Sequence, residues 1–163
     1  MKKLKKVLAL VLAVLTVLSF AACSGSNKGG DDMPTYKVLT NATFPPFDTI
    51  DEASGAVVGF DMDLIAAIGE DQGFKVEFVD MAFEALIPAI QAGNGDIIAA
   101  GMWSGDPERA EKVDFSNTYY TDGAALLVQK DNDTITGIDS LTPDQKVATQ
   151  IATNYADDLS ALV

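Results

Sequence analysis

The sequence predicts an α/β fold built on a mainly parallel sheet with helices on its faces. Two observations predict this class. Short apolar runs of strand length alternate with stretches whose apolar residues recur at helical spacing, and glycine or proline separates them. The resulting order is strand, helix, strand, helix, strand, which is the order of parallel βαβ units. With 163 residues, of which 48% are hydrophobic, the chain is long enough for one domain and part of a second.

The first predicted elements are a strand and a hairpin. Residues 36–40 form a short buried strand that leads into Asn41. Two adjacent prolines at positions 45 and 46 then end any regular element. Residues 47–50 and 56–58 are separated by a polar turn, so we expect them to pair as a hairpin.

A helix is predicted after the hairpin. It is expected to have Asp61 as its N-cap and to end at Gly73. One face of this helix carries Leu64, Ile65 and Ile68.

A strand over 75–79 comes next, and Asp80 then opens a second helical stretch. Its apolar positions at helical spacing are Phe83, Leu86, Ile87 and Ile90. Because Pro88 interrupts the pattern, we expect a tight first turn and then a helix that starts near Ala85, where proline is tolerated. A compact apolar strand over 96–100 follows.

The last predicted elements begin with a short helix. Asp106 is a typical N-cap, and Pro107 occupies the first helical position. A further apolar strand is expected over 124–128. Residues 130–163 then comprise a polar loop, a strand over 146–149 and a helical tail. A piece of this size is too small to hold its own core, so it either leans on the first domain or belongs to a second one.

Composition excludes several classes of function. The chain has 11 basic and 24 acidic residues, a net charge of −13 and a pI near 4.1, so nucleic acid is a poor partner. It has no histidine and one cysteine, which excludes histidine-dependent protease triads, histidine metal sites, zinc ribbons and internal disulfides. We therefore expect no metal and no cofactor.

The N-terminus predicts export. Four lysines within the first six residues precede an apolar run over 7–20, which is short for a membrane-spanning helix and ends in two alanines. Residues 1–22 are therefore interpreted as a signal peptide, with an uncleaved membrane anchor as the alternative. Cys23 follows at once, and residues 20–23 resemble the lipobox of bacterial lipoproteins, although Phe20 stands where leucine is usual. Residues 23–35 are predicted to be a lipidated, flexible tether; a free cysteine is the alternative.

Ligands of open α/β sheets bind beyond the carboxyl ends of the strands, so two loops are candidates for a site. The first, residues 41–47, carries an amide and two aromatic rings. The second, residues 101–109, carries small residues, Trp103 and the chain's only arginine.

Arg109 is the most informative of these residues. If Asp106 caps the helix, Arg109 falls in its first turn, where the helix dipole disfavours a cation. A bound carboxylate would offset this cost by accepting two hydrogen bonds from the guanidinium. The alternative is a surface arginine that pairs with Glu108 or Glu111.

Other residues have competing interpretations. Phe44 and Phe83 lie beside predicted strand ends, where they either form aromatic walls of a ligand site or pack in the core. Asp61 and Asp63 suggest a carboxylate pair or a cation site, but capping and first-turn placement explain them better.

Several motifs in one order resemble the polar amino-acid substrate-binding proteins of ABC importers. The segments that carry this resemblance are 41–47, 59–64, 83–92, 96–109, 113–116 with Tyr119 and Tyr120, and 146–155. They extend from about Tyr36 to the end of the chain. Several ordered motifs together are far more specific than any one of them.

The resemblance implies a lobe of the type II periplasmic-binding-protein fold, with helices on both faces of a mainly parallel sheet. In this interpretation residues 36–128 form the first lobe. Residues 129–163 form the start of a second lobe that is incomplete in this sequence. Two such lobes close on a ligand by a hinge motion.

The resemblance also implies roles for individual residues. Arg109 would hold the α-carboxylate of an amino acid, and Phe44 and Phe83 would flank its side chain. Backbone or hydroxyl contacts would come from Gly101 with Trp103 or Ser104. Contacts from the second lobe would come from Gln150, Thr153 and Asn154. Asn41 stands where many members carry aspartate, which favours a neutral polar amino acid over arginine or lysine.

The function implied is that of a non-catalytic receptor. It would be monomeric and lipid-anchored on the outer face of the bacterial cytoplasmic membrane, and would deliver an amino acid to an ABC permease. The alternatives are a periplasmic enzyme on the same fold, similar to cyclohexadienyl dehydratase, and a sensor or adhesin lipoprotein without a transporter. Because one lobe cannot enclose a ligand, the 163-residue chain is expected to bind weakly or not at all.

Overall fold

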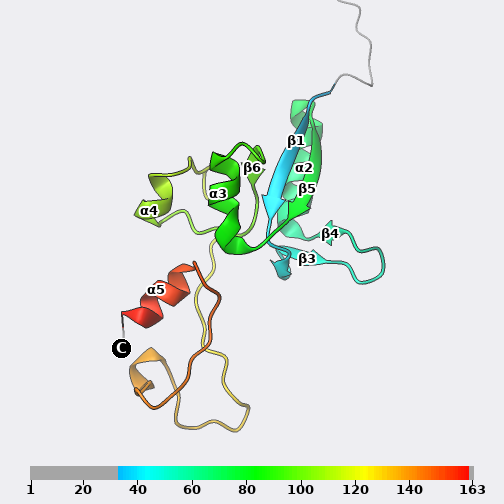
Figure 1. Ribbon diagram of the computed structural model, residues 1–163. Coiled ribbons are helices and arrows are strands. Elements are labelled where there is room, and N and C mark those ends of the chain that lie inside the picture. Colours follow the sequence, from blue (N-terminus) through cyan, green and yellow to red (C-terminus); the bar gives the residue numbers. More distant parts are fainter. Residues whose placement is uncertain (1–32, 162–163) are drawn as a thin grey trace, which may run out of the picture. The chain divides into compact units, whose positions relative to one another are not determined.

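The computed structural model describes residues 33–161 (Figure 1). The predicted signal peptide, Cys23 and most of the predicted tether lie outside the described residues. All the elements below belong to one compact unit, which begins at Pro34. In the described part of the chain, no helix has the length and apolar character needed to cross a membrane.

The central sheet is parallel, as the sequence predicts. Its strands are β5 (Lys75–Asp80), β1 (Thr35–Thr40) and β6 (Ile97–Ile98), in that spatial order. Val38 of β1 lies opposite both Phe78 and Ile97. The expected strand over 96–100 is thus shorter, because only two of its residues pair with β1.

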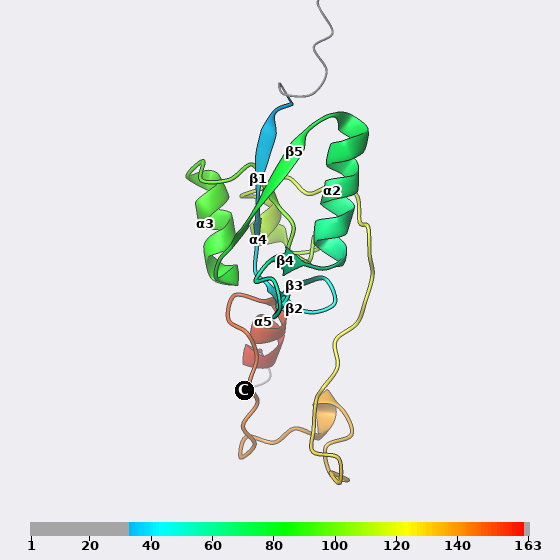
Figure 2. The same cartoon turned by 90° about the vertical axis from the view of Figure 1, so that its right-hand side faces the viewer.

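Helices lie on both sides of this sheet. Helix α2 (Phe60–Gln72) contacts β5, and α3 (Leu86–Gln91) contacts β6 and β1. Figure 2 shows α2 and α3 on opposite sides of β1 and β5. On the α3 side, Leu39, Leu86 and Ala100 form the buried core. The predicted fold class is confirmed.

A small antiparallel sheet lies next in the chain. Strands β3 (Asp48–Ile50) and β4 (Val57–Val58) form the predicted hairpin. The sequence did not predict β2 (Thr43–Phe44), which pairs with β3 before the two prolines.

The predicted N-cap of α2 is wrong. Gly59 is the cap, with a φ of 138°, and a Cβ at this position would collide with the backbone of Phe47. Asp61 therefore falls inside the first turn, where it is buried. The predicted end of the helix at Gly73 is confirmed, since its left-handed conformation lets its N–H bond to the Gly69 carbonyl. Ile68, expected on the apolar face, is exposed.

The predicted tight turn before α3 is confirmed as the 3₁₀ helix η2 (Phe83–Ala85). Asp80 does not open this helical stretch. It is the last residue of β5, and its carboxylate accepts a hydrogen bond from the backbone N–H of Ala42.

The remaining helices are short. Helix α4 (Pro107–Ala110) has Asp106 as its cap, as predicted, and the helical tail is α5 (Asn154–Ser160). A 3₁₀ turn that was not predicted, η3 (Ile138–Ser140), lies between them.

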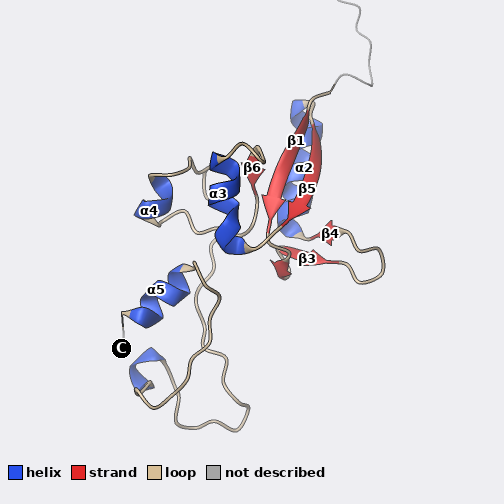
Figure 3. Ribbon diagram, in the orientation of Figure 1, coloured by secondary structure: helices blue, strands red, loops and turns tan. Residues whose placement is uncertain are grey.

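The predicted strands over 124–128 and 146–149 are not formed. Figure 3 shows loop between α4 and α5 apart from η3. Residues 121–130 are all exposed, and within the described residues no strand pairs with either segment. An apolar run becomes a strand only when a second strand accepts its hydrogen bonds.

Candidate functional site

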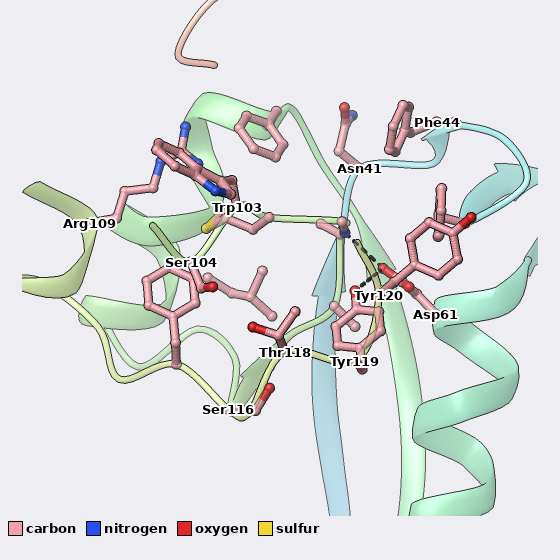
Figure 4. A pocket seen from close by; sticks show the side chains of 18 of the residues that line it. Asn41, Phe44, Asp61, Trp103, Ser104, Arg109, Ser116, Thr118, Tyr119 and Tyr120 are labelled. Atoms are coloured by element: carbon pink, nitrogen blue, oxygen red, sulfur yellow. Dashed lines mark hydrogen bonds between the residues drawn. The ribbon is translucent and has the colours of Figure 1, made fainter. Parts of the chain in front are cut away.

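A cavity of about 830 Å³ lies where residues that follow β1 and β6 come together with residues 150–155 (Figure 4). All ten ligand-binding residues inferred from the sequence line this cavity. They are Asn41, Phe44, Phe83, Gly101, Trp103, Ser104, Arg109, Gln150, Thr153 and Asn154. The cavity also borders α2 and the segment 113–124. Its position fits the rule that open α/β sheets bind ligands beyond the carboxyl ends of their strands.

Arg109 is buried beside this cavity, with 7% of its surface exposed. Its Nε lies 3.1 Å from Oδ2 of Asp106, and its Nη2 donates a 2.9 Å hydrogen bond to the carbonyl of Ala152. The guanidinium carbon lies 5.6 Å from the centre of the Phe83 ring. The alternative of a surface arginine paired with Glu108 or Glu111 is therefore wrong.

Asp106 has two functions at this point of the fold. Its Oδ1 accepts the backbone N–H groups of Glu108 and Arg109, and its Oδ2 faces the guanidinium. The carboxylate thus offsets the unfavourable position of a cation in the first turn of α4. A guanidinium has five N–H groups, so about three remain for a further acceptor after these two contacts.

Asn41 is held by three hydrogen bonds. Its Nδ2 donates to the Met81 carbonyl at 2.9 Å. Its Oδ1 accepts from Nε2 of Gln150 and from the hydroxyl of Thr43, both at 2.8 Å. At this position the site therefore presents a neutral pair of amides from two segments far apart in the sequence.

Aromatic side chains border the same cavity. Phe44 is 41% exposed and stacks on Phe47, with ring centres 5.3 Å apart. Phe83 is half-buried and packs in part against the Leu39 cluster, so it is both a wall and a core residue. Trp103 is exposed, and its indole lies so close to Gly105 that a Cβ there would collide with it.

The segment after residue 149 contributes the remaining predicted residues. Thr153 is buried, caps α5 and donates a 2.7 Å hydrogen bond to the Gln150 carbonyl. Asn154 begins α5 and is half-buried. Between them and Gln150, Ala152 has a φ of 58°, the one positive φ of a non-glycine residue in the described range.

Sequence reasoning missed Asp61 and Tyr119, which also line the cavity. Asp61 was interpreted as a cap, yet 99% of its surface is buried, and it accepts hydrogen bonds from Gly101 and Tyr119. Burial, reinforced by the negative charge of Asp61, raises the pKa of Tyr119, which keeps the phenol protonated and able to donate. The glycine at position 59 was the one local signal that the cap lies two residues before Asp61.

Asp48 is the second missed carboxylate, and it is fully buried. Burial raises its pKa to about 6, against the opposing effect of a hydrogen bond from Thr40. In the described range, no group of three or more acidic, histidine or cysteine side chains is arranged to hold a metal ion.

These features define a lobe of a type II periplasmic binding protein with a cavity beyond the carboxyl ends of its strands. The chain belongs to the bacterial extracellular solute-binding proteins, family 3, whose family model matches residues 36–161. The resemblance inferred from the motifs is confirmed.

Proteins of known name support this placement. The chain is 34% identical to the arginine-binding extracellular protein ArtP of Bacillus subtilis, over 85% of this chain and 52% of that protein. It is 33% identical to a probable histidine-binding protein of Neisseria gonorrhoeae, over 96% of this chain and 58% of that protein. The chain thus spans little more than half the length of these relatives.

Solved structures give the same result. An ancestral arginine-binding protein bound to arginine superposes with a TM-score of 0.74 and 42% identity, over 78% of this chain and 55% of that one. The ancestral amino acid-binding protein AncCDT-1, a precursor of cyclohexadienyl dehydratase, superposes with a TM-score of 0.73 and 43% identity, over 78% and 56% of the two chains.

Proposed function

We propose that the protein is an extracytoplasmic receptor that binds a free amino acid and delivers it to an ABC importer. One observation carries the proposal: a buried guanidinium, Arg109, lies beside a ligand-sized cavity and keeps N–H groups available. A carboxylate is the acceptor whose geometry such a fork fits best. The names of the relatives, which include arginine-, histidine- and cystine-binding proteins, support an amino acid as the source of that carboxylate.

In this proposal the residues act together on one ligand. Asp106 orients Arg109, whose N–H groups donate hydrogen bonds to the α-carboxylate of the ligand. Phe44 and Phe83 flank the ligand side chain. Backbone or hydroxyl contacts come from Gly101, Trp103, Ser104, Thr153 and Asn154. Since the N–H of Gly101 already bonds to Asp61, its carbonyl is the group left for the ligand.

We propose a neutral polar amino acid as the ligand. The pair of Asn41 and Gln150 supplies amide donors and acceptors without a charge. An ancestral arginine-binding protein bound to glutamine, which is 47% identical over 65% of this chain with a TM-score of 0.61, supports a ligand of this kind. The arginine-binding relatives support the cationic alternative.

The rest of the proposal concerns organisation and location. Residues 1–22 direct export, Cys23 carries the lipid, and 23–35 form the tether. Residues 36–128 are the first lobe and 129–163 belong to a second. The protein acts as a monomer without catalysis and without a cofactor, anchored on the outer face of the cytoplasmic membrane.

Calorimetry against the twenty amino acids tests this function. It is carried out on the chain and on the longest natural protein that contains it. We expect binding of glutamine or another neutral polar amino acid by the longer protein, and much weaker binding by the chain. A folded longer protein that gives no heat with any amino acid overturns the proposal. Turnover of an aromatic amino-acid precursor would establish the dehydratase alternative instead.

A further inference from the structure

Two buried carboxylates hold backbone groups of the candidate site, and one of them, Asp61, also lines the cavity. Asp48 of β3 is fully buried, and its Oδ1 accepts the backbone N–H of Phe44 at 3.1 Å. Its Oδ2 accepts the hydroxyl of Thr40 at 3.1 Å. This carboxylate therefore fixes the backbone of the residue that forms one aromatic wall.

Asp61 makes the equivalent contact to Gly101, which lines the cavity near Phe44 and forms a second wall. Its Oδ2 accepts the backbone N–H of Gly101 at 2.8 Å and the hydroxyl of Tyr119 at 2.9 Å, which are the dashed lines of Figure 4. Its Oδ1 is buried without a hydrogen-bond partner in the described range. A buried carboxylate oxygen left unpaired costs stability, so this residue is not explained by stability alone.

The two walls lie close together. Gly101 has a φ of 53°, which favours glycine, and a Cβ at this position would lie 3.1 Å from Cδ1 of the Phe44 ring. A shift of either backbone would therefore change the space between the two walls. Each carboxylate anchors one of these two backbones.

We propose that Asp48 and Asp61 are positioning residues of the amino-acid site, each of which fixes the backbone of one wall, Phe44 or Gly101. Neither carboxylate needs to touch the ligand. The inference rests on the proposed function only for the identity of the ligand, because the geometry of the walls can be measured without one.

Charge couples the two residues. The titratable groups that interact with Asp48 are Asp61, Asp80 and the phenol of Tyr119, and none of them is a cation. Burial, together with repulsion from Asp61 and Asp80, raises the pKa of Asp48 to about 6. Protonation of Asp48 weakens its bond to the Phe44 N–H, because a neutral acid is a poorer acceptor than a carboxylate.

The first test follows backbone amides by NMR over a pH series without ligand. In the wild-type chain, the Phe44 amide proton is expected to shift with a midpoint near pH 6, and the Gly101 amide is expected to exchange slowly. Asp48→Asn should abolish the Phe44 transition, and Asp61→Ala should speed exchange at Gly101. Asp63→Ala is the matched control, since Asp63 is an exposed acid in the same turn of α2. Amides that behave in the Asp48 and Asp61 variants as they do in the control overturn the proposal.

The second test measures amino-acid affinity of the folded variants. Asp48→Ala and Asp61→Ala should each weaken binding about tenfold, the loss expected for one charge-assisted contact. The isosteric Asp48→Asn and Asp61→Asn keep an acceptor oxygen and should recover part of that loss. Asp63→Ala should bind like the wild type. If the alanine variants do not fold, the asparagine variants and Tyr119→Phe supply the same comparison.

The two tests separate the two claims. A wild-type protein that binds no amino acid overturns the proposed function, and the amide measurements then decide the positioning role alone. Wild-type binding with unchanged affinity in Asp48→Ala and Asp61→Ala overturns the positioning role and leaves the function intact.

Discussion

Arg109 donates a hydrogen bond from Nη2 to the carbonyl of Ala152, 43 residues later in the chain, at 2.9 Å. The contact joins the first turn of α4 to the segment that precedes α5. The same guanidinium lies beside the cavity, so a ligand bound to it would be connected through Arg109 to the segment before α5. We expect this hydrogen bond to change when the protein closes around a ligand.

Arg109→Lys should weaken amino-acid binding about a hundredfold, because an ammonium cannot form two parallel hydrogen bonds to a carboxylate. Calorimetry on the longest natural form measures the change. Lys112→Ala removes an exposed cation two residues beyond α4 and serves as the control, with no change expected. An equal loss of affinity in both variants would mean that overall charge governs binding, and not the two parallel hydrogen bonds of the guanidinium.

Asp106 both caps α4 and contacts Arg109, and two substitutions can separate these two roles. Asp106→Ala removes the helix cap and should lower the free energy of unfolding by about 1 kcal/mol. Asp106→Ser keeps a capping oxygen, so stability should be nearly retained, but the contact with Nε of Arg109 is lost. Urea denaturation and calorimetry together check this. Ligand affinity should fall in both variants, and an Asp106→Ser protein with wild-type affinity would show that the cap is its only contribution.

Local signals in the sequence were sufficient for the elements that hold the site. Helical spacing, glycine and proline predict α2, α3, α4 and a helical tail, α5. The ten predicted residues all line one cavity, but the inclusion of Gln150, Thr153 and Asn154 rests on the family resemblance and not on a local signal. Strands over 124–128 and 146–149 were predicted wrongly, because apolar character is local whereas a pairing partner is not. Asp61 and Tyr119 were missed for the same reason: their hydrogen bond spans 58 residues, and nothing near either residue indicates it.

The free energy of unfolding should depend on pH through the titration of Asp48. Its pKa is raised from 3.8 in the unfolded chain to about 6 in the folded protein, so the folded state binds more protons between these values. Stability attributable to this group therefore increases as the pH falls from 7 to 4, by on the order of 1–2 kcal/mol. Urea denaturation at several pH values should show a flatter profile for Asp48→Asn.

A second aspartate provides the control for this profile. Hydrogen bonds from Ser54 lower the pKa of Asp51, so any stability that Asp51 contributes is lost only as the pH falls below the usual range of an aspartate. Asp51→Asn should therefore leave the profile between pH 4 and 7 unchanged. A profile for Asp48→Asn that matches the wild type would show that this carboxylate is not perturbed by burial.

Because Ala152 has a positive φ, we expect its substitution by glycine not to destabilise the protein. An alanine in the left-handed region costs about 1–2 kcal/mol, which glycine avoids, while glycine adds about 0.5–1 kcal/mol of chain entropy to the unfolded state. Ala152→Gly should therefore leave the free energy of unfolding unchanged or raise it by up to about 1 kcal/mol. Ala156→Gly, inside α5, should lower it by about 1 kcal/mol. Equal losses in the two variants, measured by urea denaturation, would mean that residue 152 is not held in the left-handed conformation. The carbonyl contact to Arg109 would then need a different geometry.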